Sequence, residues 1–195
     1  MDQDAAKATS LSWLRFDAPP PASAETDAIL AATRASLGYA RHQQEVLAYR
    51  PRILAALTAL GDAVVRDPAG ALSAREREVM ALVVSAENRC EACVFAHAAA
   101  LRKLTGQAEW AAAIAVNYRR AELTARERAL ADYAVKATRG PAEVEPTDLD
   151  ALRASGISEA GVLEAATVVA YFNFTNRLNS ALGIRANSAA YWSHR

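Results

Sequence analysis

The 195-residue sequence has only two cysteines, no long apolar run and no excess of charge of either sign. Lys plus Arg and Asp plus Glu both number 22, so no net charge attracts nucleic acid or anionic lipid. No run approaches the roughly 18 to 20 apolar residues that a helix needs to span a bilayer. The sequence therefore predicts a protein with no nucleic-acid partner and no membrane partner.

The beginning of the chain also lacks the features of a secretory signal. It reads Met1-Asp2-Gln3-Asp4, which is acidic where a signal is basic, and no apolar segment follows. We therefore expect a cytoplasmic protein. In that reducing compartment, two cysteines separated by two residues are better explained by redox or metal chemistry than by a structural disulfide.

Aromatic and β-branched residues are comparatively few, while alanine is abundant, and this composition favours helix. No segment alternates between apolar and polar residues with period two, so no sheet is expected. Residues 1–24 contain Pro19-Pro20-Pro21, which cannot be helical, and are predicted to form an arm. The prediction is one all-α domain, a multi-helix bundle over residues 25–195, preceded by that arm.

Spacing of apolar residues and capping signals indicate the helices of this domain. They are expected over 25–49 with a break near Gly38, over 51–65, from a capping box at Ser73 to about 86, over about 90–104, from Thr147, and over about 158–182. The segment Val79-Met80-Ala81-Leu82-Val83-Val84 leaves no polar face, which predicts a central helix packed on several sides.

A short pattern occurs twice, about fifty residues apart. Leu72-Ser73-Ala74-Arg75-Glu76-Arg77 is echoed by Leu123-Thr124-Ala125-Arg126-Glu127-Arg128. The echo suggests an internally duplicated helical unit. Glu78 of the first copy corresponds to Ala129 of the second, and no cysteine follows the second copy, so only the first copy carries candidate chemistry.

That chemistry lies in Cys90-Glu91-Ala92-Cys93-Val94-Phe95-Ala96-His97. On a helix, positions 90, 93 and 97 share one stripe, so the two thiols can close a disulfide. His97 is one turn from Cys93 and can take its proton directly or through one water. Unpaired donors at the helix start favour the thiolate, the form that attacks a peroxide or a disulfide.

The two cysteines compete for the role of nucleophile. Cys90 lies nearer the helix start, whereas Cys93 lies nearer a specific proton acceptor, His97. A positioned base should outweigh a dipole effect of roughly 0.3 to 1 kcal/mol, so we predict that Cys93 attacks first. Glu78, at the margin of an apolar helix, is the candidate partner of the imidazole.

Plainer interpretations remain open at this stage. The cysteines could be small apolar core residues, and Glu78 a solvated helix residue. Structural zinc normally takes four ligands from two separate chain segments. Besides His97, only His42 and His194 remain as nitrogen donors, and neither has the spacing of a ligand. No metal and no cofactor is therefore expected. Amides at 173, 176 and 179, interleaved with aromatic residues, either line a pocket or satisfy backbone groups in a core or subunit-contact helix.

Glu78, Cys90-x-x-Cys93 and His97 at this spacing resemble the active-site motif of the alkylhydroperoxidase D family, within the carboxymuconolactone decarboxylase-like superfamily. Residues 72–78 resemble that superfamily's helix opening, and 171–183 resemble its peroxidase-related branch. The best-known members have a second histidine before the second cysteine, where this chain has Ala92. The resemblance implies an all-helical fold and a symmetric homo-oligomer, commonly a trimer or hexamer.

The resemblance also implies a mechanism and two partners. A proton passes from Cys93 through His97 toward Glu78, a hydroperoxide oxidises Cys93, and Cys90 resolves the product to a disulfide. An external dithiol then restores both thiols. The alternatives are a general disulfide reductase, or a redox-sensing or ligand-binding scaffold with little peroxide turnover.

Overall fold

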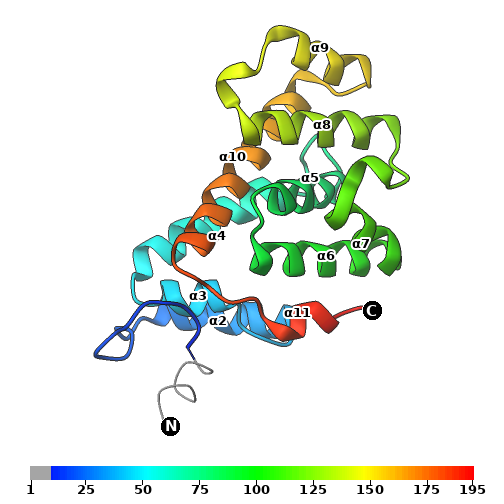
Figure 1. Cartoon of the computed structure of the whole chain (residues 1–195). Coiled ribbons are helices and arrows are strands. Elements are labelled where there is room, and N and C mark those ends of the chain that lie inside the picture. The colour runs from blue at the N-terminus through cyan, green and yellow to red at the C-terminus, as the bar shows by residue number, and fades with distance from the viewer. Residues whose placement is uncertain (1–9) are drawn as a thin grey trace.

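The computed structural model describes residues 10–195, and within that range it contains helices and no strand (Figure 1). The α-helices are α2 (Ala24–Leu37), α3 (His42–Leu47), α4 (Pro51–Val65), α5 (Ala74–Glu87), α6 (Glu91–Thr105), α7 (Ala108–Asn117), α8 (Ala125–Arg139), α9 (Pro146–Ala154), α10 (Glu159–Ala181) and α11 (Ser188–Trp192). Two single 3-10 turns, η1 (Tyr118–Arg120) and η2 (Pro141–Glu143), join some of them. The all-α prediction is confirmed.

Helix α5 is the centre of the molecule. It packs against α6, α8, α10, α7 and α4, and in Figure 1 it runs through the middle of the bundle. The segment predicted to have no polar face is buried along its whole length, from Val79 to Ser85. Because neighbours cover α5 on several sides, an ordinary amphipathic pattern would leave polar groups without water there.

The repeated sequence pattern corresponds to a repeated structure. Ser73 and Thr124 cap α5 and α8 with the same reciprocal capping box, and the two helices pack together. Ion pairs also cross between the copies in both directions. These pairs are Arg75 with Glu127 at 2.5 Å and Arg126 with Glu76 at 2.8 Å. The exchange agrees with an internally duplicated helical unit.

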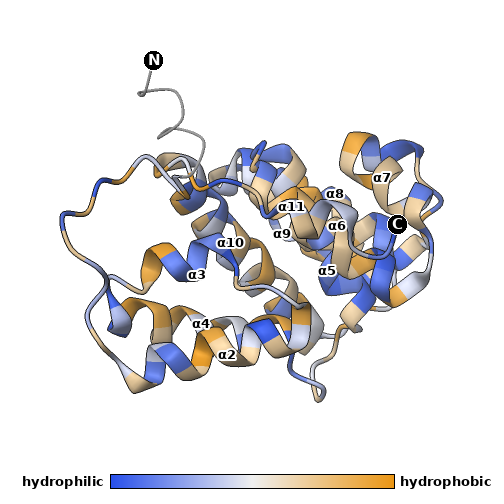
Figure 2. Cartoon of the chain, turned by 90° about the horizontal axis from the view of Figure 1, so that it is seen from below, coloured by the Kyte–Doolittle hydropathy of each residue, from blue (hydrophilic) through white to orange (hydrophobic). Residues whose placement is uncertain are grey.

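The expected break near Gly38 separates α2 from α3. Gly38 adopts a left-handed φ of 83° and its N–H caps the carbonyl of Arg34, a conformation that glycine reaches without steric cost. Helix α2 then lies beside α4 (Figure 2). Pro51 occupies the first position of α4, as predicted from its missing N–H.

The described part of the arm packs against its own chain. The Trp13 N–H donates to Leu182 O at 2.9 Å, and the indole lies over Gly183. A Cβ at Gly183 would clash with that ring, and its φ of 60° also favours glycine. Residues 1–9 of the predicted arm lie outside the described residues.

From Ser10 to the carboxyl end, no helix is long and apolar enough to cross a bilayer.

Candidate functional site

The turn between α5 and α6 places the cysteine pair. Helix α5 ends at Glu87, Asn88 caps it, and Arg89 then adopts a left-handed φ of 53°. The Asn88 amide donates to Asn173 and Asn176 of α10, which ties the turn to that helix. The chain then reverses so that α6 starts beside the carboxyl end of α5.

Cys90 is the N-cap of α6, one residue before the helix that was expected to include it. Cys93 lies in the first turn, and the two residues form a disulfide with their Cα atoms 5.3 Å apart. Both are buried, with exposed fractions of 2% for Cys90 and 5% for Cys93. The first turn of a helix favours the thiolate that would form when this bond is reduced.

Glu78 of α5 and His97 of α6 form the predicted pair. The His97 Nδ1 lies 2.7 Å from Glu78 Oε2, and both side chains are mostly buried. A carboxylate in its ionised form can only accept a hydrogen bond, and with Glu78 in that form the imidazole donates through Nδ1 and keeps Nε2 for another partner. Phe172 of α10 meets the imidazole edge to face, with ring centroids 4.5 Å apart, and so fixes the plane of the ring.

The structure brings the four predicted site residues to the facing sides of α5 and α6, where they form two separate pairs. Within residues 10–195, no hydrogen bond joins His97 to either sulfur of the disulfide. A disulfide sulfur has no proton to pass on, so this pairing belongs to the oxidised state. The roles of Cys90, Cys93, His97 and Glu78 in catalysis stay predictions.

Sequence reasoning missed the residue that does contact a sulfur. Asn179 of α10 donates from Nδ2 to Cys93 Sγ at 3.2 Å, and its Oδ1 accepts from Gln43 Nε2 of α3 at 2.8 Å. The three amides at three-residue spacing on α10 were the available signal. They bond mostly to other side chains, as in the pair of Asn176 with Ser85, and not mainly to backbone groups.

A cavity of about 1240 Å³ adjoins Glu78. Residues of α2, α4, α5 and α6 line it, together with Tyr39 and Arg41 before α3. Burial lowers the pKa of Arg41, and Arg66 adds to this effect, while the negative charge of Glu78 opposes it. The Arg41 guanidinium therefore contributes positive potential at Glu78.

The remaining histidines take no part in this cluster. His42 begins α3 and its Nδ1 lies 3.0 Å from the carbonyl oxygen of Arg185. His194 is exposed near the carboxyl end and lines the cavity beside Glu78. Among residues 10–195, no group of three or more His, Cys, Asp and Glu side chains is arranged to hold a metal ion.

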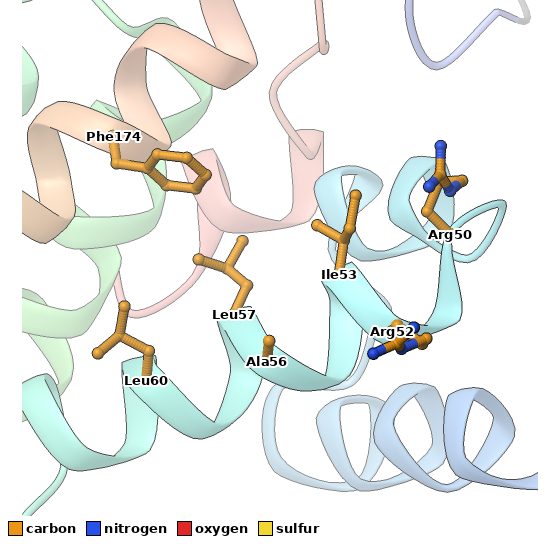
Figure 3. A pocket seen from close by; sticks show the side chains of 7 residues that line it. All are labelled: Arg50, Arg52, Ile53, Ala56, Leu57, Leu60 and Phe174. Carbon is orange, nitrogen blue, oxygen red and sulfur yellow. The ribbon is translucent and has the colours of Figure 1, made fainter.

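A second hollow lies on the outside of α4 (Figure 3). It has a volume of about 510 Å³, and Figure 3 shows Leu57 and Leu60 of α4 facing Phe174 of α10. Arg50 and Arg52 lie toward one end. We call this the α4 groove. Its lining includes none of the four predicted site residues.

Known proteins resemble the chain in sequence and in fold. Residues 51–117, which contain Glu78, both cysteines and His97, match the model of the Carboxymuconolactone decarboxylase family. The structure of an uncharacterized peroxidase-related protein from Silicibacter sp. TM1040 is 33% identical with a TM-score of 0.89, covering 96% of this chain and 97% of that one.

A second solved structure, an uncharacterized peroxidase-related protein from Ralstonia eutropha JMP134 described as an alkylhydroperoxidase AhpD core, is 29% identical. Its TM-score is 0.88, and the match covers 95% of this chain and 97% of that one. The debrominase Bmp8 shares the fold at 18% identity and a TM-score of 0.75, over 95% of this chain and 96% of its own. No curated protein matches the chain significantly.

The likeness to the Silicibacter protein extends over almost the whole of both chains, and the family model includes the helices that carry the cysteine pair. The chain belongs to the alkylhydroperoxidase D-like, peroxidase-related proteins of the carboxymuconolactone decarboxylase family.

Proposed function

We propose that the protein is a thiol-dependent peroxidase that reduces organic hydroperoxides through the Cys90–Cys93 dithiol and disulfide. The observation that carries the proposal is a disulfide at the start of α6, the helix whose His97 pairs through Nδ1 with the mostly buried carboxylate of Glu78. A redox-active pair needs both a reversible bond and a way to move a proton. The family's peroxidase-related members support the same conclusion.

The oxidative half of the cycle begins with the reduced pair. His97 Nε2 takes the proton of Cys93, and Glu78 stabilises the resulting imidazolium through Nδ1. The Cys93 thiolate attacks the terminal oxygen of the hydroperoxide, the O–O bond breaks, and the alkoxide leaves as an alcohol with the proton from His97. Cys93 becomes a sulfenic acid, and the Cys90 thiol condenses with it, which releases water and forms the disulfide.

The reductive half needs an external dithiol, whose identity the chain does not specify. A thiolate of that reductant attacks Cys90, the Cys90–Cys93 bond breaks, and Cys93 leaves as a thiolate. The second thiol of the reductant then displaces Cys90, so the reductant departs as a disulfide and two electrons stay on the protein. The cytoplasm expected from the sequence supplies such dithiols.

The burial of both sulfurs favours a second candidate, a redox switch with little turnover. At exposed fractions of 2% and 5%, a protein reductant reaches neither sulfur without movement of the surrounding helices. In a switch, oxidation of the pair would alter a contact with a partner, and slow reduction would be part of the function. The two candidates differ in the rate of the complete cycle.

The decisive experiment follows the reduced protein as it reacts with hydrogen peroxide, tert-butyl hydroperoxide and cumene hydroperoxide in stopped flow. In Cys90→Ser, peroxide should still convert Cys93 to a sulfenic acid that a dimedone probe traps, while turnover with a dithiol is lost. In Cys93→Ser, the fast phase of oxidation should vanish. Mass measurement of the trapped products identifies the modified sulfur.

The same experiment separates the candidates. Rapid oxidation followed by dithiol-driven turnover supports the peroxidase, and oxidation without turnover supports the switch. Fast peroxide consumption by Cys93→Ser together with a slow Cys90→Ser protein would reverse the roles of the two sulfurs. His97 would then have some purpose other than activating the nucleophile.

A further inference from the structure

We propose that Asn179 is a catalytic residue that stabilises the Cys93 thiolate by a hydrogen bond, and that Gln43 is the positioning residue that aims its amide at the sulfur. The proposal rests on the thiol chemistry proposed above and deepens it. It starts from two hydrogen bonds in series, Gln43 Nε2 to Asn179 Oδ1 at 2.8 Å and Asn179 Nδ2 to Cys93 Sγ at 3.2 Å. Helix α3 therefore reaches the Cys93 sulfur of α6 through the Asn179 amide of α10.

The direction of these two hydrogen bonds follows from which groups can donate and which can only accept. A sulfur of the disulfide carries no proton, so only the NH2 side of Asn179 can hydrogen bond to it. The carbonyl side must then face α3, where Gln43 supplies a donor. A thiolate is likewise an acceptor only, so the same orientation serves the reduced enzyme.

The buried surroundings strengthen the hydrogen bond from Asn179 to Cys93. Asn179 and Cys93 have exposed fractions of 6% and 5%, so water competes little for either group. A hydrogen bond to a charged acceptor in such a place is stronger than one at the surface. Of the titratable groups of the candidate site, His97 on α6, Glu78 on α5 and Arg41 before α3, none hydrogen bonds to this sulfur in the described chain.

The Asn179 amide can act in both the reductive and the oxidative half of the proposed thiol cycle. When a reductant attacks Cys90, Cys93 is the leaving group and gains negative charge as the bond breaks. When a hydroperoxide arrives, the same thiolate is the nucleophile. Asn179 therefore distinguishes the two sulfurs, because the structure gives Cys93 an amide donor on its sulfur and places Cys90 at the N-cap.

The test measures the thiolate itself, by absorbance at 240 nm during a pH titration. The background is Cys90→Ser, so that Cys93 is the only cysteine observed. Asn179→Leu should raise the thiolate pKa by about one to two units, the size expected from losing a hydrogen bond to a charged group. Asn179→Asp should raise it further, because its carboxylate repels the thiolate. Ser180→Leu, at an exposed position on the same helix α10, should leave the pKa in place.

The role of Gln43 has its own test. Gln43 donates to Asn179, whereas an ionised glutamate at the same position can only accept a hydrogen bond. Gln43→Glu should attract the Asn179 NH2 group and turn its carbonyl oxygen toward the sulfur, raising the thiolate pKa. The added charge alone would also raise it, so the substitution is repeated with Asn179→Leu, where only the charge effect remains. The shift should be at least twice as large when Asn179 is present.

An unchanged thiolate pKa in both Asn179→Leu and Asn179→Asp, with native circular dichroism, would overturn the role of Asn179. Equal shifts from Gln43→Glu with and without Asn179 would overturn the role of Gln43. The titration requires no peroxide, so a protein without peroxidase turnover can still show these shifts. Absence of turnover would count against the proposed function and leave the hydrogen-bond proposal standing.

Discussion

At the scale of single residues, Glu78 shows how one side chain distinguishes two similar helices. Its counterpart in the second copy is Ala129, yet both helices begin with the same capping box. Glu78 lies on the side of α5 that faces α6, within reach of an imidazole. The second copy has neither the carboxylate nor a cysteine pair following it, so its helix packs without carrying this chemistry.

The Glu78–His97 pair leads to a prediction about pH. With His97→Gln, the Cys93 proton loses its acceptor, so the thiolate pKa should rise and peroxide attack near neutral pH should slow. Glu78→Gln should act in the same direction more weakly, because the imidazole remains. The rate of Cys93 oxidation should be measured by stopped flow over a range of pH. In both variants, the part of the rate–pH profile that rises with pH should move to higher pH. Positioned general bases typically contribute 10²- to 10⁴-fold, which bounds the effect of His97→Gln.

Glu122→Gln is the control for this series, because Glu122 is exposed and does not line the cavity beside Glu78. It should leave the profile unchanged. If both His97→Gln and Glu78→Gln oxidise at the original rate, the proton relay has to be abandoned.

At the scale of elements, α5 and α8 hold each other through their amino-terminal turns. Glu76 caps its own helix through the Ser73 N–H and also accepts from Arg126 of the other copy at 2.8 Å. Burial raises the pKa of Glu76, but the hydrogen bonds from Arg126 and Ser73 outweigh it and the net pKa is lowered. The charged form of Glu76 is therefore favoured by folding.

A lowered folded-state pKa contributes stability above the unfolded pKa, which is about 4.3 for glutamate, and loses it as pH falls through the folded value. We expect Glu76→Gln to reduce the free energy of unfolding at pH 7 by about 1 kcal/mol, because glutamine keeps the capping hydrogen bond but replaces a charged acceptor by a neutral one. The difference from the parent protein should shrink as the pH falls below about 4. Urea denaturation at a series of pH values measures both quantities.

Glu122→Gln removes a carboxylate of the same kind from an exposed position, where changes usually stay within about 0.5 kcal/mol. A Glu76→Gln deficit that is as large at pH 3 as at pH 7 would show that the lost charge is not its cause.

At the scale of the whole molecule, the aromatic residues of α10 do not all remain available for a partner. Phe172 is buried within the chain, where it packs on His97 and Tyr171. Phe174 is 52% exposed and forms the α4 groove with Leu57 and Leu60 (Figure 3). The expectation of a homo-oligomer therefore depends on this groove, since apolar patches of this kind usually mark contacts.

We expect light scattering to give a mass above that of one chain at micromolar concentration. Phe174→Glu should shift the protein toward the monomer without changing its circular dichroism, because a charge in an apolar contact leaves an ion without water. Val116→Glu, at a highly exposed position on α7, is the control and should leave the mass as it was. A monomeric parent protein would contradict the expectation of a trimer or hexamer.

The sequence by itself determined most of the helices, although α7 and α11 were not predicted, and it indicated Glu78 as the candidate partner of His97. Local rules suffice for the capping boxes at Ser73 and Thr124 and for the proline that opens α4, because their hydrogen bonds lie within one turn. The central position of α5 followed from the absence of a polar face. The boundary at Cys90 differed by one residue, since a cap is decided by backbone angles that cysteine does not signal.

Only the tertiary structure decided what touches the reacting sulfur. Gln43, Cys93 and Asn179 lie on three helices that are far apart along the chain, and no periodicity relates them. The same holds for Arg41 beside Glu78 and for the ring of Phe172 on His97. Such contacts depend on how the helices cross, which is set by packing over the whole core and not by the residues of any one segment.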